Sequence, residues 1–448
     1  MSDLTLGDDE LGLFTDLYEL TMLQAYWAEG MGADAVFSLF FRKPPANRNI
    51  VLACGQEYAA HLAREIRFPK PQLDRLASVG MFQDGFLAWL EGFRFSGEIS
   101  AMPEGTPVFP HEPLLEVRAP VAEAQLLETL IMNMVTTETV LASKALRVTL
   151  AAGDRPVLDF GMRRMHGTDA ALRGVRAYRV AGIRATSNVL GSLRHGLPAS
   201  GTMAHSFIQA HPNETDAFRT YGRLYPGTTL LVDTYDTMAA VDKVIALVRD
   251  EGLEIGAIRL DSGDLLQLSQ QARQRLDAAG LQRIKIVVSG GLDEVKIQDL
   301  LTRGAPIDSF GVGTDMGAAV DAPSLDLAYK LTEYDGEPRL KNAPGKRLHP
   351  GAKQVWRFSD AQGRYTCDEI TGRDEQRDAE PLLRPIIRDG EPVEGPPDIQ
   401  AAHDHAWAAM ARMPEALRRL EAPDVPYPVH FSEALERLRV ETIAALSR

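Results

Sequence analysis

The chain has 448 residues, of which 45% are hydrophobic and 25% charged, a balance typical of a folded protein with two or more domains. Its formal net charge of -14 argues against nucleic acid or a membrane surface as the main partner, although a local group of cations can still bind a small anion. We expect a cytoplasmic protein for three reasons. The chain has only two cysteines, its acidic N-terminus has no signal-like apolar segment, and no apolar run is long enough to span a membrane.

The first 150 residues alternate between helical and strand-like patterns, and we expect an N-terminal α+β domain over 1–150. Thr15 or Asp16 is a suitable N-cap for the first helix, because either side chain can accept a hydrogen bond from a free backbone N–H group. The predicted segments are a helix over 11–29, a strand over 34–42, mainly helical structure over 58–92, short strands over 93–118 and a long helix over 121–150.

The next part, 151–335, consists of short apolar runs with helical segments between the later ones. Strand–helix–strand repeats at this spacing predict a parallel sheet, and seven runs favour an irregular (β/α) barrel-like catalytic domain that is closed or nearly closed. The runs are PVLDF (156–160), IRATSN (183–188), GTMAHS (201–206), TTLLVDT (228–234), GAIRLDS (256–262), KIVVSGG (285–291) and DSFGVGT (308–314), with helices near 237–252, 263–280 and 293–303.

Each run ends in a residue that can bind or react. In (β/α) barrels the carboxyl ends of the strands meet at one face, where the active site lies. We therefore expect one site to gather Asp159, Ser187, His205, Asp233, Asp261, Ser289, Gly290, Gly291, Gly313 and Thr314.

The remainder, 336–448, is predicted to be a C-terminal segment that packs back on both preceding parts. Residues 335–400 are rich in glycine, proline and charge, which is typical of loops with short strands, and 403–448 have a helical pattern. With the N-terminal domain, this segment is expected to complete an α+β sandwich.

Two of the strand ends carry glycines that suit a phosphate. VVSGGLDE places Gly290 and Gly291 between a strand and a helix, and FGVGTDMG places Gly313 and Thr314 in the same way. Glycine lets backbone N–H groups approach a phosphate closely, and the following helix N-terminus favours an anion. Either loop alone is more often an ordinary turn, but two consecutive loops at the end of a barrel are typical of a phosphate site.

The RLDSGD segment follows another strand. Asp261 can bind ribose hydroxyls or a magnesium ion on a pyrophosphate, and Arg259 can direct a planar cation at a carboxylate or phosphate. Asp261 or Ser262 can also cap the next helix, and the two roles are compatible.

Three other positions have both a structural and a functional interpretation. His205 can be a base, an acid or a nucleophile, although a lone histidine is more often structural. Phe160 beside Arg163 suits a flat anionic ring, and equally a core aromatic next to solvated arginines. Tyr18 lies on the first helix, whose other apolar residues are explained by packing alone.

Taken together, these segments resemble the nicotinate phosphoribosyltransferase family, within the type II phosphoribosyltransferases. GTMAHSF together with RLDSGDL is the most specific part of the resemblance. The matching stretches run in order from residue 13 to residue 357: LFTDLYELTM, FFRKPP, EGTPVFPHEPLLEV, DFGMRRMHG, ATSNVL, GTMAHSF, VDTYDT, RLDSGDL, FGVGTDMG and PGKRLHPGAKQVWR.

The resemblance implies that the ring nitrogen of nicotinate attacks the anomeric carbon of phosphoribosyl pyrophosphate. Nicotinate mononucleotide forms and pyrophosphate leaves, which is the entry of nicotinic acid into NAD salvage. The resemblance also implies ATP hydrolysis coupled through a phosphorylated His205, Mg²⁺ on the pyrophosphate with unknown protein ligands, and a homodimer with shared active sites.

By motif, the resemblance assigns roles to thirteen positions. His205 and Asp261 would be catalytic, with Asp261 facing the ribose or the metal. Nicotinate would be bound by Tyr18 from the neighbouring subunit, Phe160, Arg163, Ser187, Thr202 and Arg259. Phosphoribosyl pyrophosphate would be bound by Ser262, Gly290, Gly291, Gly313 and Thr314.

Ser187 favours nicotinate over nicotinamide, because the nicotinamide-using relatives carry an acidic residue there, which would repel a ring carboxylate. A quinolinate enzyme needs more basic residues and has no use for a histidine in this motif. A remoter alternative is a phosphate-binding barrel lyase, but such an enzyme needs a Schiff-base lysine at a strand end, and none of the seven runs ends in lysine. Another is a binding protein without catalysis, which would not require His205.

Overall fold

The computed structural model of the protein describes residues 6–342 and 347–446. The chain forms two compact units, one built from the residues up to Ser143 together with those from Ser324 onward, and the other from Lys144–Pro323. The first unit thus joins N-terminal and C-terminal segments in mainly antiparallel sheets, and the second carries a parallel sheet. This agrees with the predicted α/β fold class.

The second unit is built on a six-stranded parallel sheet in the order β7-β6-β11-β10-β9-β8. Because β7 and β8 are the two edge strands, the described residues form a curled half-barrel and not a closed one. The strands are β6 (Val157–Asp159), β7 (Ala185–Thr186), β8 (Thr228–Leu231), β9 (Ile255–Leu260), β10 (Lys285–Val288) and β11 (Ser309–Val312).

Six of the seven predicted runs are strands, and the prediction for 201–206 is wrong. There the chain touches the sheet earlier, through an isolated bridge between Ala199 and Thr186. It then runs irregularly to Ala204, and the helix α9 (His205–Gln209) begins at His205. The histidine therefore follows the sheet on a helix and does not end a strand.

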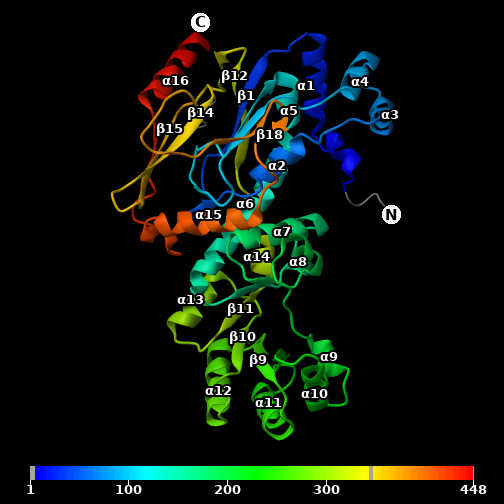
Figure 1. Ribbon diagram of the computed structural model, residues 1–448, viewed down its shortest axis with the longest axis vertical. Helices are drawn as coiled ribbons and strands as arrows, with labels where there is room; N and C mark the ends of the chain where they lie inside the picture. Colours follow the sequence, from blue (N-terminus) through cyan, green and yellow to red (C-terminus); the bar gives the residue numbers. More distant parts are fainter. Residues whose placement is uncertain (1–5, 343–346, 447–448) are drawn as a thin grey trace. The chain divides into compact units, whose positions relative to one another are not determined.

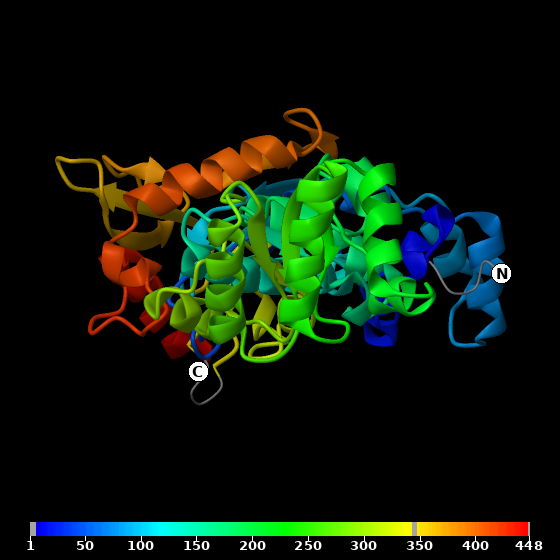
Figure 2. The same ribbon diagram turned by 90° about the horizontal axis from the view of Figure 1, so that it is seen from below.

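The helices predicted between the later strands are confirmed, and aspartates fix where they begin. α11 (Thr237–Glu251), α12 (Leu265–Ala278) and α13 (Glu294–Thr302) each follow an aspartate whose side chain accepts a hydrogen bond from the backbone N–H three residues later. The helices that follow the later strands stand against the sheet in Figure 1 and, seen from below, in Figure 2. The unit also contains η2 (Met162–Arg164), α7 (Thr168–Val180), α8 (Val189–His195), α10 (Glu214–Leu224) and α14 (Thr314–Ala318).

The first unit has a seven-stranded sheet in which three N-terminal strands lie side by side, with two strands from the C-terminal part of the chain on either side. β1 lies between β12 and β5, and β17 pairs with β3, all antiparallel. β1 is buried at every position after Asp34, so it forms the centre of this core. The strands are, in sheet order, β13 (Glu337–Pro338), β12 (Leu327–Tyr334), β1 (Asp34–Phe41), β5 (Leu115–Pro120), β3 (Glu98–Ala101), β17 (Arg384–Arg388) and β18 (Glu391–Pro392).

Two smaller sheets and a set of helices complete the first unit (Figure 1). The sheets contain β16 (Glu380–Pro381), β14 (Lys353–Ser359), β15 (Tyr365–Gly372) and β19 (Val429–Phe431), and β2 (Val51–Leu52) with β4 (Pro107–Val108). The helices are η1 (Asp8–Leu13), α1 (Leu17–Ala28), α2 (Gln56–Ala63), α3 (Lys70–Ser78), α4 (Asp84–Glu91), α5 (Val121–Leu126), α15 (Ile399–Arg412), η3 (Glu415–Arg418) and α16 (Glu433–Leu446), and α6 (Glu128–Ala152) continues from this unit into the next.

A buried charged cluster lies between β14 and β15. The guanidinium of Arg357 donates hydrogen bonds to both carboxylate oxygens of Asp368 and to the carbonyl of Pro107. Glu112 is fully buried beside them and accepts a hydrogen bond from the backbone N–H of Phe109. Burial, and then the negative charge of Asp368, raise the pKa of Glu112 well above its usual value.

We predict that Glu112→Gln makes the protein more stable at pH 8 by about 1 kcal/mol, because the amide can donate to Asp368 without a charge to bury. An acid whose folded-state pKa is raised stabilises the fold below its unfolded-state pKa and loses that contribution as pH rises. The advantage of the variant should therefore shrink towards pH 5. Urea denaturation of both proteins at the two pH values measures this difference, and an equal difference at both would contradict the prediction.

Candidate active site

The carboxyl ends of the parallel strands surround a pocket with two lobes in the second unit. The first lobe, of about 180 Å³, is lined by Ser187, Thr202, His205 and their neighbours, and the second, of about 170 Å³, by the two glycine loops. Phe160, Arg163, Arg259 and Asp261 line both lobes, so the two spaces are adjoining parts of one site.

Arg259 holds the boundary between the lobes. Its Nε donates to the hydroxyl of Ser289 at 2.7 Å, and its two terminal nitrogens donate to Thr202 at 2.8 Å and to Asp261 at 2.6 Å. The guanidinium carbon lies 5.2 Å from the ring centroid of Phe160. These bonds use three of the five guanidinium N–H groups, which leaves two for a ligand.

Asp261 is an ionised carboxylate. Burial alone would raise its pKa, but a hydrogen bond from Ser289 and the charge of Arg259 outweigh burial, and the pKa is lowered. Asp233 supports the same loop, because its Oδ2 accepts hydrogen bonds from the backbone N–H of Asp261 at 2.9 Å and from the hydroxyl of Ser262 at 2.7 Å.

His205 faces Asp261 across the first lobe. Its Nε2 lies 3.8 Å from Asp261 Oδ2, and its Nδ1 lies 3.1 Å from the hydroxyl of Thr234. Thr234 therefore fixes the plane of the ring, and Nε2 is the nitrogen that points towards the acid. The side chain is 40% exposed, so a ligand in the lobe can reach it.

Phe160 is held by the loop after β6. The carboxylate of Asp159 is buried and accepts hydrogen bonds from the backbone N–H of Gly161 at 2.8 Å and from the hydroxyl of Thr186 at 2.6 Å. The ring of Phe160 packs onto Gly311, where a Cβ atom would come within 2.4 Å of the ring. Asp159 and Gly311 therefore position the aromatic ring, and Gly311 also lines the second lobe.

The second lobe has the backbone of an anion site. Gly290 has φ +91°, and a Cβ atom there would lie 1.8 Å from the carbonyl oxygen of Asp261, so only glycine fits. Within the described chain, neither Gly290 nor Gly291 has a hydrogen-bond acceptor for its backbone N–H. Thr314 begins the helix α14 directly after Gly313. Arg164 lines this lobe beside Arg163, so η2 contributes two cations to it.

Eleven of the thirteen residues expected in the site line the pocket, and Ser262 and Tyr18 are the exceptions. The hydroxyl of Ser262 is taken by Asp233, and this residue is absent from the described lining of both lobes. Tyr18 belongs to the other unit, where it is 45% exposed beside a groove between α1 and the start of α6. Two residues of the site, Thr234 and Asp315, were not predicted from the sequence, although both lie in the quoted motifs VDTYDT and FGVGTDMG.

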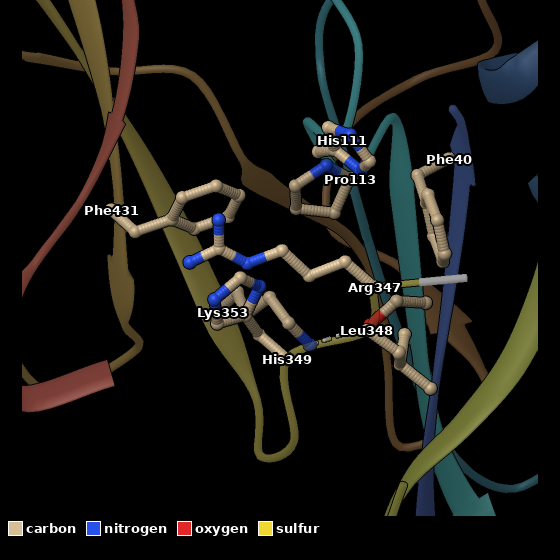
Figure 3. Close-up of a pocket in the computed structure, with 9 residues that line it drawn as sticks. Phe40, His111, Pro113, Arg347, Leu348, His349, Lys353 and Phe431 are labelled. Carbon is tan, nitrogen blue, oxygen red and sulfur yellow. Dashed lines mark hydrogen bonds between the residues drawn. The ribbon is translucent and has the colours of Figure 1, made fainter. Parts of the chain in front are cut away.

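A separate small pocket lies in the first unit (Figure 3). The guanidinium of Arg347 lies 5.1 Å from the ring centroid of Phe431, and His349 stacks on the same ring at 3.9 Å. Lys353 donates a hydrogen bond to Ser38 at 3.1 Å. These side chains leave about 10 Å³ free, which is room for one water molecule.

In the described ranges, no three His, Cys, Asp or Glu side chains converge as a protein-built metal site requires. Nor does any helix in those ranges have the length and apolar character needed to cross a membrane.

Comparison with known proteins agrees with this geometry. Residues 13–136 match the nicotinate phosphoribosyltransferase (NAPRTase) N-terminal domain, 156–359 the NAPRTase family, and 375–439 the nicotinate phosphoribosyltransferase C-terminal domain. The chain is 48% identical over 426 residues to nicotinate phosphoribosyltransferase pncB2 of Mycobacterium tuberculosis, with 94% of this chain and 92% of the relative covered.

Two further relatives extend the likeness. The nicotinate phosphoribosyltransferase of Bacillus subtilis is 39% identical over 388 residues, which cover 84% of this chain and 79% of the relative. The crystal structure of human nicotinic acid phosphoribosyltransferase superposes with a TM-score of 0.85 at 28% identity, and covers 95% of this chain and 99% of that structure. The chain therefore belongs to the nicotinate phosphoribosyltransferase family.

Proposed function

We propose that this protein joins nicotinate to phosphoribosyl pyrophosphate, forming nicotinate mononucleotide and pyrophosphate for NAD salvage. The observation that carries the proposal is that Arg259 and Asp261 line both lobes of the pocket. A ring in the first lobe and a sugar phosphate in the second would then meet at these two residues, as the joining of a base to a ribose requires.

Nicotinate is assigned to the first lobe. Phe160 supplies an aromatic surface, and Arg163 with the two free N–H groups of Arg259 supplies positive charge for the ring carboxylate. Thr202 is bonded to Arg259, and so helps to hold the cation in place. The 5′-phosphate is assigned to the second lobe, against the N–H groups of the glycine loops.

The reaction needs positioning and charge more than a strong base. The bond from the anomeric carbon to pyrophosphate breaks as the ring nitrogen attacks, and positive charge builds up on the ribose. Asp261 is ionised and lies at the boundary of the lobes, where it can stabilise that charge. The arginines attract both anionic substrates, and no proton has to be removed from the ring nitrogen of nicotinate.

The residues present also fit magnesium bound mainly by the substrate. Magnesium is commonly held by one or two carboxylates together with substrate phosphates, and not by a closed protein cage. Asp261 is ionised, and Oδ1 of Asp233 is buried without a hydrogen-bond partner among the described residues. These two carboxylates would hold the ion, which would supply charge neutralisation to the departing pyrophosphate.

ATP is assigned as a co-substrate through His205. Thr234 orients the ring, so that Nε2 can attack the γ-phosphorus of ATP. The N–P bond forms as the bond to the ADP oxygen breaks, and Asp261 stabilises the charge that develops on the imidazole. Water then hydrolyses the phosphohistidine, which releases phosphate and restores His205.

The first test offers nicotinate, nicotinamide or quinolinate to the purified protein with phosphoribosyl pyrophosphate and magnesium, with and without ATP. Mass spectrometry measures the mononucleotide formed. We expect product from nicotinate, stimulated by ATP in the wild type but not in His205→Ala. Product mainly from another ring would contradict the substrate assignment. No product from any ring would overturn the proposed activity. A Schiff-base lyase is a poor alternative, because no lysine is among the described residues that line the two lobes.

Substrate choice is expected to depend on Ser187, an exposed residue of the first lobe. Ser187→Asp should lower kcat/KM for nicotinate by roughly a hundredfold, because two like charges side by side cost several kcal/mol. It should leave or improve the use of nicotinamide, whose amide can donate to the new carboxylate. Ser187→Asn is the uncharged control of similar size. An equal loss with Ser187→Asn would show that size, and not charge, decides.

A homodimer with shared sites is supported by Tyr18, an aromatic side chain that is 45% exposed on α1. If Tyr18 completes the partner's site, Tyr18→Ala and His205→Ala should each be impaired, but mixed subunits should recover activity. Random exchange makes half of the dimers mixed, each with one intact site, so about a quarter of wild-type activity is expected. If activity does not recover after subunit exchange has been demonstrated, Tyr18 belongs to its own subunit's site.

A cytoplasmic location is proposed from the acidic, cysteine-poor composition alone.

A further inference from the structure

A buried lysine lies beside the phosphate-binding side of the site. Lys144, on α6, has a side chain that is 2% exposed, and its Nζ contacts three carboxylates. The distances are 2.6 Å to Glu294, 2.5 Å to Asp315 and 3.0 Å to Asp321. Arg147, one turn further along the same helix, donates to the other oxygen of Glu294 at 2.9 Å.

Two of these carboxylates come from the segments that form the second lobe. Glu294 is the first residue of α13, three residues after Gly291, and Asp315 is the second residue of α14, two residues after Gly313. One ammonium group therefore bonds to both segments that follow the glycine loops. Asp315 also lines the second lobe itself, where the phosphate is assigned.

Lys144 and Glu294 stabilise each other's charged forms. Burial opposes the charge on Lys144, but hydrogen bonds from its nitrogen to Asp315 and Glu294 outweigh burial and raise its pKa. Burial likewise opposes the charge on Glu294, but the bond from Lys144 lowers its pKa. Removing the ammonium would leave Glu294 with Arg147 as its remaining counter-charge, and Asp315, which faces the phosphate, without the ammonium that it pairs with.

We propose that Lys144 is a positioning residue for the sugar phosphate. It holds the two glycine loops at a fixed separation and neutralises Asp315, so that the second lobe accepts a phosphate dianion. This inference rests on the proposed function, in which that lobe binds the 5′-phosphate. Lys144 lies behind the loops and is not among the residues that line the pocket, so it acts through Glu294 and Asp315.

The test measures phosphate binding apart from catalysis. Isothermal titration with ribose 5-phosphate gives the affinity of the second lobe, and steady-state kinetics gives KM for phosphoribosyl pyrophosphate and for nicotinate. Lys144→Met should weaken the affinity for ribose 5-phosphate and raise KM for phosphoribosyl pyrophosphate, each by about tenfold or more. A displacement of one loop by about 1 Å is enough to cause a loss of this size. KM for nicotinate should stay within about twofold, since Ser187 and Thr202 are not bonded to this cluster.

Two further variants separate positioning from general destabilisation. In the Lys144→Met background, Asp315→Asn removes the uncompensated charge and should restore part of the lost phosphate affinity. Arg357→Met breaks a buried ion pair of the first unit and should lower the melting temperature without changing ribose 5-phosphate affinity. If Lys144→Met does not fold, Lys144→Gln with and without Asp315→Asn allows the same comparison.

The outcomes distinguish the inference from the proposed function. A selective loss of phosphate affinity with rescue by Asp315→Asn supports the positioning role. Equal affinities in the wild type and Lys144→Met overturn it, and so does an equal loss in Lys144→Met and Arg357→Met. A wild type that does not bind ribose 5-phosphate at all overturns the phosphate assignment itself, and the positioning role with it.

Discussion

The geometry of the site depends on the guanidinium of Arg259. It joins the ends of β9 and β10 to the irregular segment before α9, because it bonds at once to Asp261, Ser289 and Thr202. A flexible lysine could not make these three bonds in one plane. With its position fixed in this way, the cation presents its free N–H groups where the two lobes meet, and it lowers the pKa of Asp261 beside it.

Much of this arrangement could be predicted from the sequence, because strand ends obey a simple geometric rule. A parallel sheet brings the carboxyl ends of its strands to one edge, so the order of the runs was enough to bring Phe160, Asp261 and the glycine loops together. The rule failed at 201–206, where apolar residues precede a short helix and not a turn. Ser262 lies just beyond the end of β9 and its hydroxyl donates to Asp233, and its contact with the substrate stays a prediction.

The parts that could not be predicted are long-range polar pairs. Lys144 and Glu294 are 150 residues apart, and nothing in the helical pattern of α6 marks one lysine as buried. Thr234 and His205 are 29 residues apart, and a threonine after a strand has many possible partners. Hydrophobic periodicity reports which face of an element is buried, but it does not report which charge lies opposite that face.

The charge distribution explains how an acidic protein can bind anionic substrates. The chain carries a formal net charge of -14, yet Arg163, Arg164 and Arg259 all line the pocket. The carboxylates nearby are engaged: Asp261 is paired with Arg259, and Asp315 with Lys144. Paired carboxylates add little net field, whereas exposed arginines attract an anion at close range. The site is therefore locally cationic because its carboxylates are paired with cations. A partner such as Lys144 thus affects substrate binding without contacting the substrate.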